Sequence, residues 1–289
     1  MSVGRAAGAG WSAALRMPRV LALLWAANAG FAGLAAAFVL LPLAGELAHS
    51  ALGESEFAAL GFDSAVALGS AHRGELRVGL VGAALCAALY AAASVYLAGG
   101  VLDRLRDPSS RGLLGACSRL FGRMLAVGGL ALVFAGLVVA LPYWGLAKAV
   151  EAATKDAAGP LVPFLANAAR ALVVLLLASW AARVYDYARI AAVLEPERPA
   201  AWIFGRSLGF VWRHGRATLA LWLLLAALAP ILWLVQLEVA GRWPPHTAAG
   251  MWAQLALAQV LVLARAAAGV ATLGGQMALL RSAAPRPSR

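Results

Sequence analysis

Charged side chains are scarce in this sequence and are missing from long stretches of it. Only 13% of the residues are Asp, Glu, Lys or Arg, whereas 63% are hydrophobic. Soluble domains average about 25% charged and about 45–50% hydrophobic residues, so a water-soluble fold does not account for this apolar excess. Four stretches contain no charged residue and are each long enough to cross a hydrocarbon core of about 30 Å: residues 20–45, 78–102, 124–147 and 217–237. The sequence therefore predicts a membrane protein with several spans.

Recognisable catalytic motifs are also absent. The sequence has no HExxH and no Walker motif, which are the usual marks of zinc proteases and nucleotide-binding enzymes. Residues 205–209 match the GxSxG spacing of serine hydrolases, but they lie within an amphipathic helical stretch and not at the strand-to-helix turn which that motif needs. We therefore expect neither an enzyme nor a bound cofactor. The acidic segment 46–77 contains His49 and His72, but their spacing matches no metal motif, so a solvated segment is expected rather than a metal site. The only cysteines, Cys86 and Cys117, are expected to be small apolar residues rather than a disulfide pair.

Two further apolar stretches are each interrupted by one charge, Arg170 within residues 157–182 and Arg265 within residues 247–280. An arginine at a helix centre costs about 2.5–3.5 kcal/mol on insertion, which neighbouring leucines, valines and alanines offset. Residues 51–76 carry too many charges to form a span. The sequence thus predicts an all-α polytopic membrane protein in one domain, residues 1–289, with six spans at about 20–44, 78–101, 123–146, 161–183, 217–239 and 251–279.

Basic residues are distributed unequally over the segments between these spans. The N-terminal segment and every second segment after it together hold 17 Arg and five acidic residues, whereas the other segments hold three Arg, two Lys and eight acids. Because cytoplasmic loops are enriched in Arg and Lys, both termini are predicted to be cytoplasmic. The net charge of +11 then reflects topology and not nucleic-acid binding, since the arginines are spread over four segments. The abundance of Ala, Gly and Arg indicates a bacterial protein, and hence the bacterial cytoplasmic (inner) membrane.

A weak repeat of about 100 residues places a basic amphipathic segment before every second span, at residues 11–19, 111–123 and 202–216. We expect short helices in the cytoplasmic interface, with apolar faces in the headgroup boundary and arginines near lipid phosphates. Alternatively, these segments are bent continuations of the membrane helices. Prolines favour helix ends or kinks, and those in question are Pro108, Pro196, Pro199, Pro142 and Pro230.

Spans 2 and 6 end in glycine pairs, Gly99–Gly100 and Gly274–Gly275, which permit close approach of another helix. Asp186, with Arg183 and Arg189 three residues to either side, predicts an ion network that stabilises the end of span 4; proton transfer is the alternative. The first glycine pair, the tract 186–189 and the stretch 202–216 resemble poorly characterised bacterial six-span membrane proteins, similar to the membrane domain of some glycerophosphodiester phosphodiesterases. The phosphodiesterase domain is missing here. The resemblance implies a helical membrane fold near lipid metabolism or the envelope, without catalytic residues.

Polar residues inside the spans are the candidate binding residues. The four on span 6, from Gln254 to Gln276, fall within about 40° of one another around a helix. The two on span 4, Asn167 and Arg170, lie three residues apart. Such residues face the bundle interior or a wet cavity, where arginine binds a phosphate or carboxylate headgroup; alternatively, both arginines satisfy helix carbonyls or pair with Glu238. The candidates are Asn167, Arg170, Gln254, Arg265, Thr272 and Gln276.

These features favour a non-enzymatic membrane module that interacts with anionic lipid or with partner membrane proteins, including further copies of itself. A carrier or channel for a lipid-like or small anionic solute is the first alternative, motivated by the polar stripe on span 6. A membrane-embedded enzyme that modifies lipid is the second. The substrate, the oligomeric state and the pathway do not follow from these residues.

Overall fold

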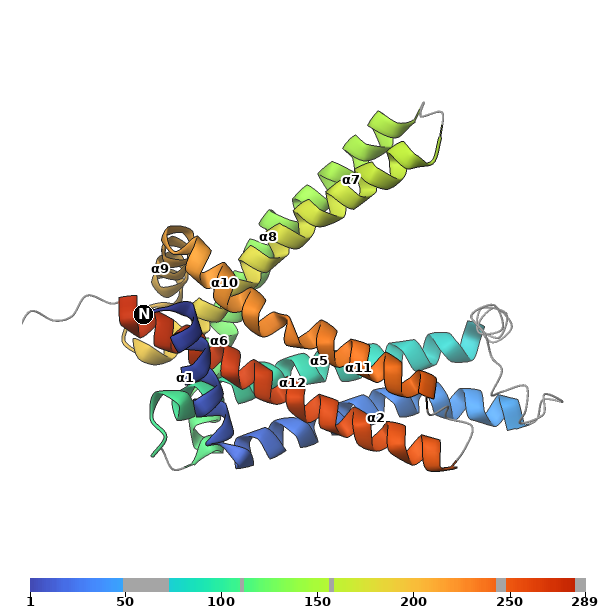
Figure 1. The fold of residues 1–289 in the computed structure, drawn as a ribbon, viewed down its shortest axis with the longest axis horizontal. Helices are drawn as coiled ribbons and strands as arrows, with labels where there is room; N and C mark the ends of the chain where they lie inside the picture. The colour runs from blue at the N-terminus through green and yellow to red at the C-terminus, as the bar shows by residue number, and fades with distance from the viewer. Residues whose placement is uncertain (49–72, 110–111, 156–158, 243–247, 284–289) are drawn as a thin grey trace, which may run out of the picture. The chain divides into compact units, whose positions relative to one another are not determined.

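The computed structural model describes residues 1–48, 73–109, 112–155, 159–242 and 248–283, and these form helices joined by short connections, with no strand among them (Figure 1). The helices are α1 (Val3–Leu15), α2 (Pro18–Ala48), α5 (Arg73–Arg106), α6 (Leu113–Ala135), the π-helical turn η1 (Gly136–Ala140), α7 (Leu141–Thr154), α8 (Leu161–Leu194), α9 (Ala200–Arg213), α10 (Gly215–Ala226), α11 (Leu228–Arg242) and α12 (Ala248–Ala283).

Six helical stretches in the described part of the chain are long and apolar enough to cross a membrane. They correspond one to one to the six predicted spans: Pro18–Leu41, Arg77–Arg106, Leu113–Thr154, Leu161–Leu194, Gly215–Val239 and Ala249–Ala283. Many of their large apolar side chains are exposed, such as Leu41 at 70% and Leu132 at 76%. Water would disfavour so much exposed apolar surface whereas lipid would not, which indicates a multi-pass membrane protein.

Proline accounts for the helix ends and for one irregular turn. α5 ends two residues before Pro108, and α8 ends two residues before Pro196. Pro142 has no N–H to donate to the carbonyl of Val138, which lies in η1. At the end of η1 the Leu141 N–H bonds to the Gly136 carbonyl, five residues earlier, as in a π-helix. The break between α10 and α11 falls at residue 227, next to Pro230.

The three amphipathic segments do not all form separate helices. α9 is a helix of its own, and residues 11–19 cover the end of α1 and the start of α2. Residues 113–123, in contrast, are the first turns of α6 and continue without a break toward α7, as the alternative of continued membrane helices requires. A position of α1 and α9 in the membrane interface stays a prediction.

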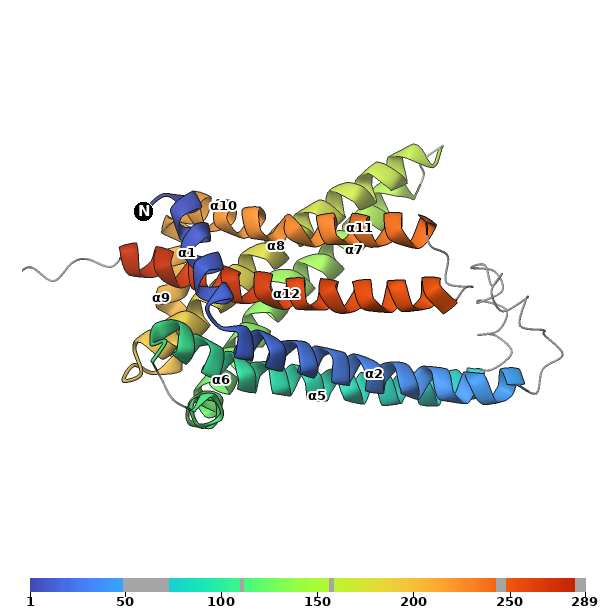
Figure 2. The same ribbon diagram turned by 60° about the horizontal axis from the view of Figure 1, so that its bottom comes forward.

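The described chain divides into two compact units. Unit 1 comprises Met1–Ala14, Val95–Ala226 and Val270–Arg289, and unit 2 comprises Leu15–Ser94 and Ala227–Gly269. In unit 1, the buried core gathers around the C-terminal half of α8, with Tyr187 and Ile190 fully buried. In unit 2, α2 and α5 run side by side (Figure 2), and Gly82 of α5 admits the Phe38 ring of α2.

Candidate functional site

Glycine allows α1 to cross α12 in direct backbone contact. A Cβ atom on Gly10 would collide with the Ala271 carbonyl oxygen and lie 2.7 Å from the Gly275 nitrogen, and a Cβ on Gly275 would lie 3.0 Å from the Ala6 carbonyl oxygen. No side chain fits at such a crossing, so the glycines determine how closely α1 approaches α12. Gly274 also lies at this crossing, where its added Cβ would be 3.1 Å from the Gly10 Cα.

The other predicted glycine pair packs on α6. A Cβ on Gly100 would clash with the Cys117 sulfur and lie 2.9 Å from the Leu113 carbonyl oxygen, and a Cβ on Gly99 would lie 3.0 Å from the Leu120 Cβ. This contact holds the end of α5 against the first turns of α6. It also buries Cys117 completely, as an apolar residue and without a disulfide.

A polar cluster joins α8 to α12. The Asp186 carboxylate forms an ion pair with Arg189 one turn later, and the Gln276 amide donates to the other carboxylate oxygen at 3.3 Å. The Arg189 guanidinium also stacks over the Tyr185 ring at 4.3 Å. We call Asp186, Arg189 and Gln276 the α8–α12 cluster. Of the predicted binding residues, Gln276 thus reaches this ion pair.

Arg183 does not join this cluster, although its spacing from Asp186 suggested it. Its Nε donates to the Ser179 carbonyl at 3.1 Å, and its Nη1 reaches the Thr218 hydroxyl at 3.3 Å. Arg183 therefore links α8 to the first turns of α10. Its side chain is buried and its charge is held by oxygen dipoles and not by a carboxylate.

Several polar atoms beside these residues are buried without a hydrogen-bond partner in the described part of the chain. They include the hydroxyl of Tyr187, which is fully buried, and the side-chain oxygen of Gln276, which is 1% exposed. Most buried polar atoms in proteins are paired, and an unpaired one costs about 1–3 kcal/mol. The α8–α12 cluster and the neighbouring Tyr187 therefore form a buried polar group in unit 1 that could make further hydrogen bonds.

Arginines satisfy free carbonyls where α8 ends. Arg106 of α5 donates to the Val193 carbonyl at 2.9 Å, and Arg123 of α6 donates to the Glu195 carbonyl at 2.7 Å. Arg123 also bonds the carbonyls of Pro196 and Arg198. The last carbonyls of a helix lack partners within it, and cations are favoured at that end. These arginines therefore complete the α8 terminus and fix the turn into α9.

The remaining predicted binding residues do not gather into one site. Asn167 donates to the Pro163 carbonyl of its own helix at 2.8 Å, and Arg170 stacks over the Tyr143 ring at 5.2 Å. Arg170 lies sixteen residues from Asp186 on α8, roughly 24 Å along the helix axis. Gln254 and Thr272 are half-buried on α12.

Arg265 is exposed on α12 and has no hydrogen bond or ion pair within the described ranges. Glu238, considered above as its partner, pairs instead with Arg242 at 2.6 Å. The histidines of the acidic segment, His49 and His72, lie outside the described residues. Among the residues that are described, no group of three His, Cys, Asp or Glu side chains is suited to hold a metal ion.

α9 has one buried face and one exposed face. Ile203, Phe210 and Val211 are buried against unit 1, whereas Trp202 and Trp212 are 42% and 76% exposed. The exposed face also carries basic residues that continue into α10. We call the following residues the α9 surface: Trp202, Arg206, Trp212, Arg213 and Arg216.

Two of the three arginines of the α9 surface, Arg213 and Arg216, form no ion pair with a described acidic residue, whereas Arg206 does. The sequence contains no acidic residue from position 198 to position 216. Arg206 pairs with Glu195, and it also stacks over the Trp202 ring at 5.4 Å, with Arg198 over the same ring at 4.9 Å. Arg213 bonds only the carbonyl of Gly209 in its own helix, at 3.2 Å. The surface therefore combines indole rings with free positive charge.

Two contacts in unit 2 were not predicted. The Tyr90 hydroxyl donates to the Asn28 side-chain oxygen at 2.6 Å, joining α5 to α2, and the Trp25 indole donates to Gln259 at 3.0 Å, joining α2 to α12. A signal for the first was present, because Asn28 is the only amide or hydroxyl side chain in the charge-free stretch 20–45.

In comparisons with known proteins, no family model, no curated protein and no solved structure matches this chain.

Proposed function

We propose that this chain is a non-enzymatic, multi-pass protein of the bacterial cytoplasmic membrane that associates with anionic lipid through the α9 surface. The observation that carries the proposal is the exposed face of α9, where Trp202 and Trp212 lie beside arginines in a stretch without acidic residues. Indole rings favour the headgroup level of a bilayer. Each arginine near an anionic surface adds about 1 kcal/mol of attraction.

The buried face of α9 supports this orientation. Because Ile203, Phe210 and Val211 pack into unit 1, the helix is held by protein on one side and presents its basic side to the surroundings. The predicted topology assigns this end of α8 to the cytoplasm, where the leaflet carries anionic lipid. The resemblance to six-span proteins near lipid metabolism favours the same role and supplies no catalytic residue.

Native mass spectrometry of the protein released from nanodiscs tests the proposal. Nanodiscs would contain phosphatidylglycerol and phosphatidylcholine in equal amounts, and the retained lipids would be identified for wild type and for Arg213→Gln/Arg216→Gln. Removing two charges at about 1 kcal/mol each lowers the preference for phosphatidylglycerol roughly 10- to 30-fold. Neither arginine pairs with a carboxylate among the described residues, so the double variant leaves no acid unpaired.

The matched control removes two exposed charges from segments predicted to lie on the other side of the membrane, Arg77→Gln/Lys148→Gln. This variant has the same change in net charge, and it should retain phosphatidylglycerol like wild type. Equal loss in both double variants would assign the lipid preference to net charge alone. No loss in either would refute a lipid role for the α9 surface.

A carrier of small anions is a second candidate because of Arg265. This side chain is exposed on a predicted span and has no partner within the described ranges, and a cation in such a position is costly unless it serves an anion or reaches water. Proteoliposomes loaded with phosphate would show efflux that Arg265→Gln abolishes. Efflux equal to that of empty liposomes would remove this candidate.

A further inference from the structure

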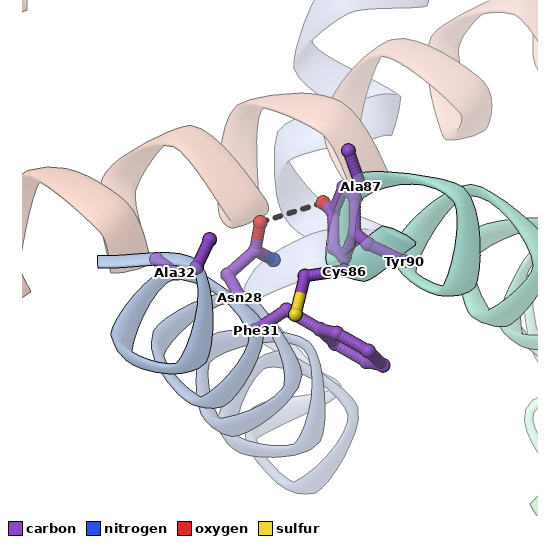
Figure 3. Close-up of a pocket in the computed structure, with 7 residues that line it drawn as sticks. Asn28, Phe31, Ala32, Cys86, Ala87 and Tyr90 are labelled. Carbon is purple, nitrogen blue, oxygen red and sulfur yellow. Dashed lines mark hydrogen bonds between the residues drawn. The ribbon is translucent and has the colours of Figure 1, made fainter. Parts of the chain in front are cut away.

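Unit 2 contains a groove between α2 and α5 with apolar walls and one polar end (Figure 3). Its volume is about 230 Å³. Phe31, Ala32 and Ala35 line it from α2, Cys86 and Ala87 line it from α5, and Asn28 and Tyr90 also border it. Such a combination of apolar walls and few polar groups is typical of small-molecule sites.

The groove exists because small residues lie between two aromatic contacts. On one side, Gly82 admits the Phe38 ring, whose Cγ would lie 2.7 Å from an added Cβ. On the other side, Phe31 and Tyr90 meet edge to face at 5.6 Å between ring centroids. Between these contacts the helices carry mainly alanine, which is too short to fill the space between them.

The polar end keeps hydrogen-bonding capacity. Asn28 donates one amide N–H to the Leu24 carbonyl at 2.7 Å and accepts from the Tyr90 hydroxyl at 2.6 Å. An asparagine amide has two N–H donors, and a phenol oxygen can accept as well as donate. One donor of Asn28 and the oxygen of Tyr90 thus stay available to a ligand hydroxyl or carbonyl.

The depth of the groove restricts the charge of that ligand. Asn28 lies about ten residues into the span Pro18–Leu41, roughly 15 Å from its start and near the middle of a hydrocarbon core of about 30 Å. No charged side chain lines the groove, and a charged group at this depth would be strongly disfavoured. A phospholipid headgroup is therefore a poor fit.

We propose that this groove binds a neutral lipophilic molecule of one or two rings that carries a hydroxyl or carbonyl group. An apolar cavity of about 150 Å³ already accommodates benzene in another protein, so the larger groove takes a molecule of naphthalene size. Aromatic walls favour a ring, because ring pairs gain about 0.5–1.5 kcal/mol beyond their buried area. The Asn28–Tyr90 pair selects the polar group.

Binding of 1-naphthol to the protein in nanodiscs tests this site by equilibrium dialysis, with empty nanodiscs of the same lipid as the partition background. Wild type should bind 1-naphthol above background and prefer it to naphthalene about fivefold, as expected for one hydrogen bond of about 1 kcal/mol. Ala32→Phe fills the groove and should reduce binding to background. Leu34→Phe makes the same kind of change at an exposed position of α2 outside the groove and should bind like wild type.

Asn28→Leu/Tyr90→Phe provides a second test that does not depend on filling the groove. It removes both polar partners while keeping side chains of similar size, so naphthalene should bind as in wild type and the preference for 1-naphthol should vanish. Gel filtration and circular dichroism verify that each variant is folded. Binding of 1-naphthol by Ala32→Phe at the wild-type level, or an unchanged preference in Asn28→Leu/Tyr90→Phe, would overturn the proposal and leave Asn28–Tyr90 as a helix-packing contact only.

Discussion

The two units hold their helices together with different chemistry. In unit 1, arginines of α5 and α6 donate to backbone carbonyls at the end of α8, as Arg106 and Arg123 do. In unit 2, two side-chain bonds between helices are neutral, from Tyr90 to Asn28 and from Trp25 to Gln259. Both units also use glycine where helices meet closely, such as Gly10 and Gly82.

This difference follows from where each contact lies along its helices. Helix ends leave carbonyls without partners, and a cation near the end of a span reaches water or headgroups at little cost. Helix middles have no free carbonyls, and a cation there is expensive, so neutral amide and phenol groups make the contacts. Two arginines depart from this pattern. Arg183 of unit 1 is buried within α8 and bonds the Thr218 hydroxyl, whereas Arg265 of unit 2 has no partner within the described ranges and therefore remains a candidate for function.

The largest effect is expected where α1 crosses α12 in unit 1. Gly10→Val places a branched side chain against backbone atoms of Ala271 and Gly275, which cannot move without separating the helices. We expect a loss of about 3 kcal/mol or more in the free energy of unfolding, measured by SDS titration in mixed micelles. Gly8→Val is the control, because a Cβ on Gly8 meets nothing within 4 Å. Equal losses in both variants would mean that helix propensity and not the crossing is responsible.

The next effect concerns the arginine contacts that distinguish unit 1. Arg123→Gln removes the cation that bonds the carbonyls of the turn from α8 to α9, and we expect a loss of about 2–4 kcal/mol in the same titration. Arg119→Gln, one turn earlier on α6, is the control. The Arg119 side chain is 68% exposed and lies 3.5 Å from Asp103, whose side chain is 13% exposed. Because the arginine of this pair lies in solvent, the pair is expected to contribute no more than about 1 kcal/mol. Similar losses of stability in both variants would show that the bonds from Arg123 to the backbone carbonyls stabilise the fold no more than the ion pair of Arg119 does.

A change of opposite sign is expected inside the core of unit 1. The Tyr187 hydroxyl is fully buried and has no partner within the described ranges, while its ring packs against Phe210 at 4.9 Å. Tyr187→Phe keeps the ring and removes the unpaired group, so stability should rise by about 1 kcal/mol. Tyr96→Phe should instead lower it, because the Tyr96 hydroxyl lies 2.8 Å from that of Ser118. A loss in Tyr187→Phe would indicate that this hydroxyl is hydrogen-bonded in the folded protein.

The number of spans followed from the sequence because it depends on local properties, whereas the helices of spans 3 and 4 run beyond the predicted bounds, to Leu113–Thr154 and Leu161–Leu194. Charge-free length predicts a span, and proline favours a helix end or a distortion, as near Pro108 and Pro142, although Pro42 lies within the unbroken α2. Residues 113–123 were harder, because an amphipathic pattern is the same for a helix on the membrane surface and for one that packs on a neighbour. The contact of Gly100 with Cys117 decides for packing, and it joins residues on two different helices, which the period of one helix does not reveal.

Side-chain partners were less predictable than helices. The spacing of Asp186 and Arg189 predicts their ion pair, since both lie on one helix. The same spacing predicts Arg183 as a third member, but Thr218 of α10 lies within reach and binds it instead. The stripe on span 6 likewise places Gln276 on a helix face without saying what lies opposite. Such partners depend on packing between elements, which periodicity does not contain.

A smaller effect is expected for the neutral contact of unit 2. Asn28→Leu removes the bond from Tyr90, and hydrogen bonds between membrane helices average about 0.6 kcal/mol, so the loss in the SDS titration should be of that size. Asn167→Leu is the control, because the Asn167 amide bonds only a carbonyl of its own helix and should change stability less. A loss as large as that of Arg123→Gln would break the distinction between neutral and cationic contacts.

The smallest effect is expected where unit 1 uses a carboxylate outside the spans. The Ser109 hydroxyl and backbone N–H donate to Asp107 at 2.6 and 3.0 Å, and these bonds lower the pKa of the carboxyl group, the hydroxyl most of all. Because this pKa is lower in the folded chain than in the unfolded chain, ionised Asp107 stabilises the fold. The contribution is fully present at a pH above the pKa of the unfolded chain, and it is lost as the pH falls through the pKa of the folded chain. Ser109→Ala should therefore raise the pKa of Asp107 toward its usual value.

Carbon-detected NMR of the Asp107 carboxyl group measures this shift, with Ser12→Ala as an exposed control that should leave the pKa unchanged. Stability at neutral pH should hardly respond, because the carboxylate is fully exposed and water replaces the lost bond. A clear loss of stability at neutral pH would contradict this. It would mean that the linker after α5 contributes to the fold as Arg106 and Arg123 do, and that the division between helix-end and surface contacts in unit 1 is wrong.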